Sequence, residues 1–190
     1  MCNGRNRKKY RLNLETSNIA YWTIRVMHDN PILPLVRNPY KLLEVAGLKK
    51  GQKVIEVGCG PGFFTIPAAR IVGNEGHIYA VDIHPRAVDR VKKKIKKAAL
   101  TNVTPLCVNA SNTKLPGGSI DLAFIFGLRS IAGGFEGMIF ELHRVLKPEG
   151  ILSFEKTRGS EGKLIKEVER GGFAYTGKQG RIFVFKKKGE

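Results

Sequence analysis

The sequence lacks the features that mark several classes of protein. Its 190 residues contain no apolar run near the roughly 18 residues of a membrane span. Residues 1–11 are basic, but the apolar stretch of a secretory signal does not follow them. The cysteines, Cys2, Cys59 and Cys107, are too scattered to predict a disulfide framework or a paired metal site. We therefore expect one globular domain in the reducing cytoplasm, with no membrane span and no bound metal.

Acidic residues are also few, because 16 stand against 33 basic residues and the formal net charge is +17. The excess lies outside residues 101–150, in which the two signs balance. The densest lysine run lies within residues 92–97. Such charge could attract RNA or an anionic surface. Lysine runs without interleaved aromatic residues are more typical of a solvated face, which is the interpretation we favour, with RNA kept as an alternative partner.

Apolar segments alternate between strand-like and helix-like patterns along most of the chain. Strands are expected at residues 53–57, 77–81, 103–108, 120–126 and 151–155, with a closing hairpin at 173–175 and 182–186. Helices are expected at residues 39–46, 63–72, 135–146 and 161–170, and from residue 85 onwards. This order predicts a Rossmann-like α/β fold with a mainly parallel seven-stranded sheet, helices on both faces and an antiparallel C-terminal hairpin.

Residues 1–37 interrupt this regular order and predict an N-terminal arm that serves as a lid. Within them, residues 17–28 have apolar side chains at helix-like spacing. Asn38 followed by Pro39 is typical of a helix start, because Asn caps well and Pro suits the first helical turn. We therefore expect residues 38–190 to form the α/β domain that carries the binding site.

A glycine-rich loop follows the first predicted strand. Its glycines, Gly58, Gly60 and Gly62, would let the backbone turn sharply and approach a ligand. A dinucleotide fingerprint would need a third glycine where the chain has Phe63. Glu56 precedes the first glycine by two residues, so the spacing reads E-x-G-x-G-x-G.

This loop resembles the first motif of class I methyltransferases that use S-adenosylmethionine (SAM). A carboxylate such as Glu56 suits SAM, which carries a positive amino group and a sulfonium but no pyrophosphate. Cys59 would pack inside the loop as a small residue. Asp82, which ends the second strand, would accept the ribose hydroxyls. The resemblance further implies that Ile83 and His84 flank the adenine.

Further motifs extend the resemblance over residues 42–156. They are Val108-Asn109-Ala110, Leu115-Pro116, Ser119-Ile120-Asp121, Phe126-Gly127-Leu128-Arg129 and the segment 143–150. Together they are similar to the ubiquinone/menaquinone C-methyltransferase branch. This implies that Asn109 and Ala110 lie beside the adenine, and that Phe126 and Gly127 complete the cofactor site where the methyl group meets its acceptor. That branch has a long insertion after the fifth strand, whereas this chain has only a short stretch there.

The sequence therefore predicts a SAM-dependent methyltransferase that acts on a small molecule. Two alternatives remain: an RNA methyltransferase that uses the basic surface, and a SAM-binding module that regulates a partner without catalysis. His28 and Tyr21 are candidates for a general base by location alone, and a role in the lid is favoured for both. Neither the acceptor nor the oligomeric state follows from the sequence.

Overall fold

The computed structural model describes residues 37–127, 133–156 and 159–189. Apart from Arg37, the predicted N-terminal lid of residues 1–37, including the helix-like segment at residues 17–28, lies outside the described residues. The strands are β1 (Lys53–Val57), β2 (His77–Asp82), β3 (Val103–Cys107), β4 (Ile120–Ile125), β5 (Leu146–Glu155), β6 (Phe173–Gln179) and β7 (Ile182–Lys187). The helices in this part of the chain are α3 (Pro39–Val45), α4 (Thr65–Val72), α5 (Pro85–Lys97), α6 (Phe135–Val145) and α7 (Glu161–Arg170).

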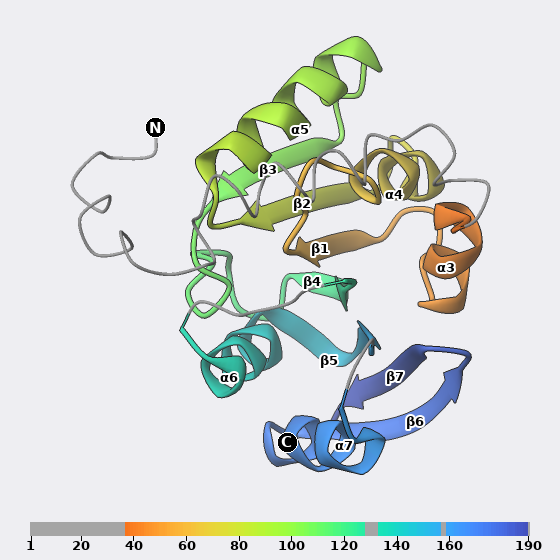
Figure 1. Cartoon of the computed structure of the whole chain (residues 1–190), viewed down its shortest axis with the longest axis vertical. Helices are drawn as coiled ribbons and strands as arrows, with labels where there is room; N and C mark the ends of the chain where they lie inside the picture. The colour runs from red at the N-terminus through yellow and green to blue at the C-terminus, as the bar shows by residue number, and fades with distance from the viewer. Residues whose placement is uncertain (1–36, 128–132, 157–158, 190) are drawn as a thin grey trace.

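The described strands form one sheet in the order β3-β2-β1-β4-β5-β7-β6 (Figure 1). The first five strands pair in parallel, and β7 pairs antiparallel with both β5 and β6. This confirms the predicted mainly parallel sheet with its C-terminal hairpin. Between β1 and β4 the chain changes the direction in which it adds strands. In open α/β sheets, ligands bind at such a switch point, outside the carboxyl ends of the strands.

Helices cover both faces of the sheet. One core cluster joins α3, α4 and α5 to one face, through residues such as Leu43, Ala68 and Val91. A second cluster joins α6 and α7 to the other face, through residues such as Met138 and Val168. The central strand β1 is buried on both faces from its second residue onwards, as expected when helices cover a parallel sheet on both sides.

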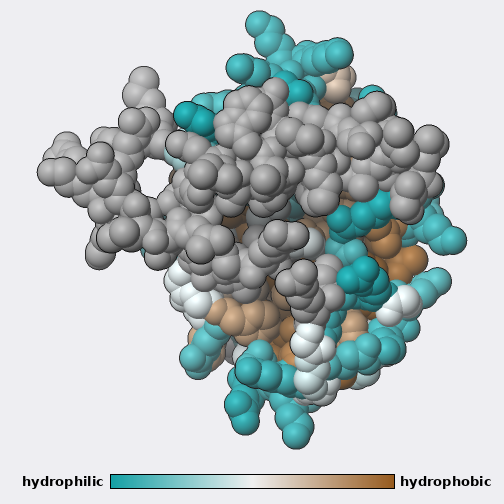
Figure 2. Space-filling model, in the orientation of Figure 1, coloured by the Kyte–Doolittle hydropathy of each residue, from teal (hydrophilic) through white to brown (hydrophobic). Residues whose placement is uncertain are grey.

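Helix α5 has one apolar face and one strongly basic face. Ala87, Val88 and Val91 are buried against the sheet. Lys92, Lys93, Lys96 and Lys97 are exposed, and Lys94 is half-buried. Figure 2 shows hydrophilic side chains that project at the top of the molecule, where α5 lies in Figure 1. The structure thus bears out most of the predicted solvated lysine face.

The start of β5 differs from the prediction. The strand was expected to begin at Ile151, but β5 begins at Leu146. Leu146 is fully buried and pairs with Ile120 of β4, and the next paired residues are Ile151 and Leu122. The extra residues of β5 form an irregularity in which Glu149 has a φ of 61°. Pro148 and Gly150 therefore lie within an irregular part of the strand and do not precede it.

No helix in residues 37–127, 133–156 or 159–189 combines the length and apolar character needed to cross a bilayer.

Candidate active site

The glycine loop connects β1 to α4 at the switch point of the sheet. The amides of Gly58 and Cys59 both donate to the carbonyl of Val81 in β2, at 2.8 and 3.0 Å. Gly58, Gly60 and Gly62 have φ values of 73°, 50° and 81°, a region that side chains with a Cβ rarely enter. The loop conformation therefore requires glycine at all three predicted positions.

Gly62 has a second constraint, which comes from packing. A Cβ added at this residue would lie 3.1 Å from Cγ2 of Val91 and 3.6 Å from Cδ of Lys94, both on α5. The glycine thus allows α5 to pack closely against the start of the β1–α4 connection.

Asp82 joins the glycine loop to the segment that follows β2. Its Oδ2 accepts from the amide of Gly60 at 2.9 Å, and its Oδ1 accepts from the amide of His84 at 2.8 Å. Burial raises the pKa of Asp82, and these backbone amides partly oppose that rise. Each carboxylate oxygen can accept more than one hydrogen bond, so the bonds to the loop leave acceptor capacity for a diol.

Glu56 lies one residue before the end of β1 and is almost completely buried. Its Oε2 accepts from the hydroxyl of Thr65 at 2.6 Å. Burial raises the pKa of Glu56 to about 8, the Thr65 hydroxyl opposes this rise, and the nearby Asp82 charge adds to it. A cationic ligand at this point would favour the ionised form of both carboxyls. This donor and acceptor set fits SAM, which carries a ribose diol and two positive groups.

Two of the residues predicted to flank the adenine follow Asp82. His84 is buried, and its ring accepts from the amide of Arg86 at 3.2 Å, so it caps the N-terminus of α5. Burial also lowers the pKa of His84 and favours the neutral ring. Sequence reasoning missed this capping role, which holds α5 in place whether or not the ring contacts a ligand. Ile83 is half-buried at the carboxyl end of β2.

Asn109 and Ala110 are half-buried in the loop that follows β3. Oδ1 of Asn109 accepts from the amide of Ser111 at 2.9 Å, which shapes the loop. A Cβ added at Gly133 would lie 2.5 Å from Oγ of Ser111 and 3.0 Å from Nδ2 of Asn109. Gly133 is therefore needed for the segment before α6 to approach this loop, a packing role that the sequence did not reveal.

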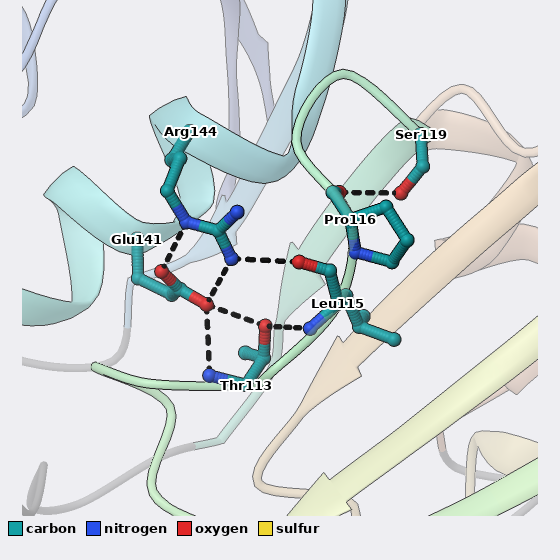
Figure 3. Close-up of polar contacts among 6 residues, drawn as sticks. All are labelled: Thr113, Leu115, Pro116, Ser119, Glu141 and Arg144. Atoms are coloured by element: carbon teal, nitrogen blue, oxygen red, sulfur yellow. Dashed lines mark hydrogen bonds and ion pairs between the residues drawn. The ribbon is translucent and has the colours of Figure 1, made fainter.

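A polar network anchors the loop between β3 and β4 to α6 (Figure 3). Glu141 accepts from the amide and hydroxyl of Thr113 at 2.8 and 2.5 Å, and from Nε of Arg144 at 2.8 Å. Nη2 of Arg144 also donates to the carbonyl of Leu115 at 2.7 Å. These hydrogen bonds, with the Arg144 charge, hold the pKa of Glu141 at about 2 despite burial. Two motifs that the resemblance treated separately, at Leu115 and Arg144, thus form one structural unit.

The carboxyl ends of β4 and β5 bring together a further group of residues. The buried ring of Phe126 packs edge-on against Phe64, with centroids 5.1 Å apart, and Gly127 beside it is exposed. Arg37 lies over the Phe64 ring and forms an ion pair with Glu155 at the end of β5. Sequence reasoning missed this ion pair, because its members are 118 residues apart.

The remaining predictions concern the two base candidates, the cysteines and metal binding. His28 and Tyr21 lie outside the described residues. Cys59 is buried and free, and burial raises the pKa of its thiol, which agrees with a packing role. Cys107 is disulfide-bonded, which the scattered spacing of the cysteines did not predict. The described residues contain no cluster of acidic, His or Cys side chains suited to a metal ion.

A mainly parallel sheet with a strand-end glycine loop, a buried Glu56 and a half-buried Asp82 is typical of one class: the class I SAM-dependent methyltransferases. A family profile described as a methyltransferase domain matches residues 48–187. The chain belongs to this family, and family and fold together imply the use of SAM.

Similar proteins agree with this assignment. A demethylmenaquinone methyltransferase of Geobacillus stearothermophilus is 36% identical over 105 residues, which make up 55% of this chain and 44% of the relative. A protein-L-isoaspartate O-methyltransferase of Ignicoccus hospitalis is 35% identical over 80 residues, 42% of this chain and 38% of that one. The chain thus spans less than half the length of these relatives. A SAM-dependent methyltransferase from Aquifex aeolicus has a similar structure, with a TM-score of 0.75 and 26% identity over 87% of this chain and 95% of that one.

Proposed function

We propose that this chain transfers the methyl group of SAM to a small organic acceptor. The observation that carries the proposal is the pair of carboxyls, the buried Glu56 and the half-buried Asp82, held around a loop that requires glycine. SAM supplies an already activated methyl group: a bond forms between the nucleophile and the methyl carbon, and the electron pair of the broken sulfur–carbon bond stays on sulfur. The protein's task is then to orient the two reactants and to exclude water.

In this proposal each carboxyl has a separate part of the cofactor to hold. Asp82 accepts the ribose hydroxyls, because its oxygens lie between the glycine loop and the start of α5. Glu56 faces the positive end of the ligand, where the Thr65 hydroxyl fixes its orientation. Ile83 and the Asn109–Ala110 loop, with the help of Ser111, form the adenine end.

The acceptor is proposed to be small for two reasons. The relatives named demethylmenaquinone methyltransferases are named for a small organic acceptor. The basic face of α5 also consists of lysines spaced along a helix without interleaved aromatic residues, and most of them are exposed, which is more typical of a solvated surface than of an RNA-binding site.

The test is methyl transfer from radiolabelled SAM into a fractionated extract of the source cell. Label in the small-molecule or lipid fraction supports the proposal. Label in a nuclease-sensitive fraction would replace it with RNA methylation. Tight binding of SAM by calorimetry with no label in any fraction would instead favour a regulatory SAM-binding module. An Asp82→Ala protein serves as the inactive control, since it lacks the proposed ribose contact.

A further inference from the structure

The carboxyl ends of β4 and β5 lie beside the cofactor loop and hold a cluster on the side where the methyl group would meet its acceptor. Its members are Arg37 before α3, Phe64 before α4, Gly127 after β4 and Glu155 at the end of β5. They come from four separate parts of the chain. Because the glycine loop and Asp82 account for the ends of β1 and β2, the ends of β4 and β5 are left for the methyl acceptor.

The guanidinium of Arg37 is fixed on two sides. Its Nη2 is ion-paired with Oε2 of Glu155, whose side chain is only 6% exposed, against 23% for Arg37. Its Cζ lies 4.9 Å from the centroid of the Phe64 ring. The Glu155 carboxylate is thus more deeply buried than the guanidinium it binds, and the Phe64 ring packs against one face of that guanidinium. These two contacts hold Arg37 in one orientation although it is not fully buried.

The other terminal nitrogen of Arg37 is still able to bind a ligand. Nη1 has no hydrogen-bond partner among residues 37–127, 133–156 and 159–189. Gly127, which follows β4, is exposed, and a Cβ added there would lie 3.8 Å from Nη1. The absence of a side chain at Gly127 thus leaves this N–H edge uncovered. A guanidinium fork with free donors suits an anionic oxygen better than a neutral one.

We propose that Arg37 recognises the methyl acceptor by donating from Nη1 to an anionic oxygen, so that the preferred acceptors are organic acids: carboxylates or acidic phenols and enols. Glu155 and Phe64 are positioning residues that orient the guanidinium. The proposal rests on the proposed function, because it takes the ends of β4 and β5 as the acceptor side. An anionic acceptor would also be attracted to the positive cofactor, which orients the two reactants towards each other.

A purely structural role for the Arg37–Glu155 pair makes different predictions. If the pair only fastens the start of α3 to β5, then loss of either partner lowers stability and leaves ligand binding unchanged. If Arg37 binds an anion, Glu155 competes with that anion for the same guanidinium. Removal of the Glu155 charge then strengthens anion binding, even where it lowers the melting temperature. Opposite signs for the two variants therefore separate the two roles.

The experiment is a ¹⁹F NMR titration with 4-fluorobenzoate and its neutral analogue 4-fluorobenzamide, run with and without S-adenosylhomocysteine. We expect the benzoate to bind about tenfold more tightly than the benzamide, and Arg37→Met to remove that preference. Arg37→Lys is expected to retain part of it, and Glu155→Gln to strengthen benzoate binding several-fold. Arg170→Met, which changes an exposed arginine at the end of α7, is the matched control and is expected to have no effect.

Equal binding of the two probes, or an unchanged benzoate affinity in Arg37→Met, would overturn the proposal. If Arg37→Met does not fold, the increase or decrease in affinity of Glu155→Gln decides the question alone. Calorimetry with S-adenosylhomocysteine distinguishes failure of the proposed function from failure of the proposed role of Arg37. A protein that binds the nucleoside but not the benzoate retains the proposed function and loses the role of Arg37. One that binds the benzoate but not the nucleoside retains an anion site and loses the proposed function.

Discussion

Asp82 is the residue on which the proposed cofactor site most depends, since it contacts both the glycine loop and the start of α5. We predict that Asp82→Ala weakens SAM binding by about a hundredfold, because two hydrogen bonds to a charged group are lost. Gly60→Val is expected to abolish binding, because the valine cannot adopt a φ of 50° without strain. Calorimetry measures both, and circular dichroism checks folding. Asp89→Ala, an exposed acid on α5, is the control.

Normal SAM affinity in both variants would show that the cofactor lies elsewhere. Loss of binding in Asp89→Ala as well would point to a general effect of charge on the protein rather than to a ribose contact at Asp82.

Glu56 gives the site a dependence on pH. Its pKa of about 8 keeps the carboxyl largely neutral at pH 6 to 7, and a cationic ligand binds the ionised form. We predict that SAM affinity rises as pH increases from 6 to 8, by up to about tenfold per pH unit, and that binding releases a proton. Calorimetry in two buffers with different ionisation enthalpies counts that proton. Glu56→Gln is expected to bind weakly with no pH dependence, and a pH-independent affinity in the unmodified protein would contradict the prediction.

Glu56 should also lower the free energy of unfolding at alkaline pH. An acid whose pKa is raised from 4.5 to about 8 favours the folded state while it is neutral, and this contribution is lost as pH rises towards and through 8. We predict that Glu56→Gln melts at a higher temperature than the unmodified protein at pH 9, because the amide has no charge to desolvate. At pH 5 the two should melt at similar temperatures. A lower melting temperature for Glu56→Gln at pH 9 would show that Glu56 is ionised and well solvated.

At the scale of elements, the network between α6 and the β3–β4 loop should govern acid stability. The folded pKa of Glu141 is about 2, below its ordinary value of 4.5, so its contribution is present above pH 4.5 and lost as pH falls through 2. We predict that Glu141→Gln lowers the free energy of unfolding at pH 7 by about 1–3 kcal/mol. Urea unfolding at pH 7 and at pH 2.5 measures this difference, which should shrink at the lower pH. A difference that stays constant would assign the loss to packing alone.

The boundaries of the helices and strands show what local sequence patterns can predict. β1 and α7 begin and end at the residues that the apolar pattern predicted. Asn38 caps α3 as expected, accepting from the amide of Lys41 at 3.2 Å. β5 was placed too short, because Pro148 and Gly150 resemble a turn while the burial of Leu146, which extends the strand, depends on its neighbours in the fold.

The same limit applies to the site. The proximity of Glu56, Asp82 and the glycines could be predicted, because they share one strand–loop–helix unit and the end of the next strand. The Arg37–Glu155 pair could not, because only the sheet brings residues so far apart in the chain together.

At the scale of the whole molecule, the charge of +17 need not serve the reaction. We predict that replacing Lys92, Lys93, Lys96 and Lys97 with Gln leaves methyl transfer to a small acceptor unchanged, within about twofold, because these side chains are exposed on the face of α5 that points away from the sheet. Steady-state kinetics with labelled SAM provide the measurement. The same replacements at Lys163 and Lys166 on α7 give the matched control. A loss of activity restricted to RNA would instead identify α5 as an RNA-binding surface.

The position of β7 between β5 and β6 has a consequence for how the protein is made. The ribosome produces β6 before β7, so β6 emerges without the strand that will join it to the sheet. Until β7 inserts, the outer edge of β5 has unsatisfied backbone groups, and Glu155 lacks the strand neighbour Ile182. We therefore expect that a nascent chain that has reached only β6 already contains the whole glycine loop, whereas the end of β5, where the acceptor is proposed to bind, still lacks its neighbouring strand.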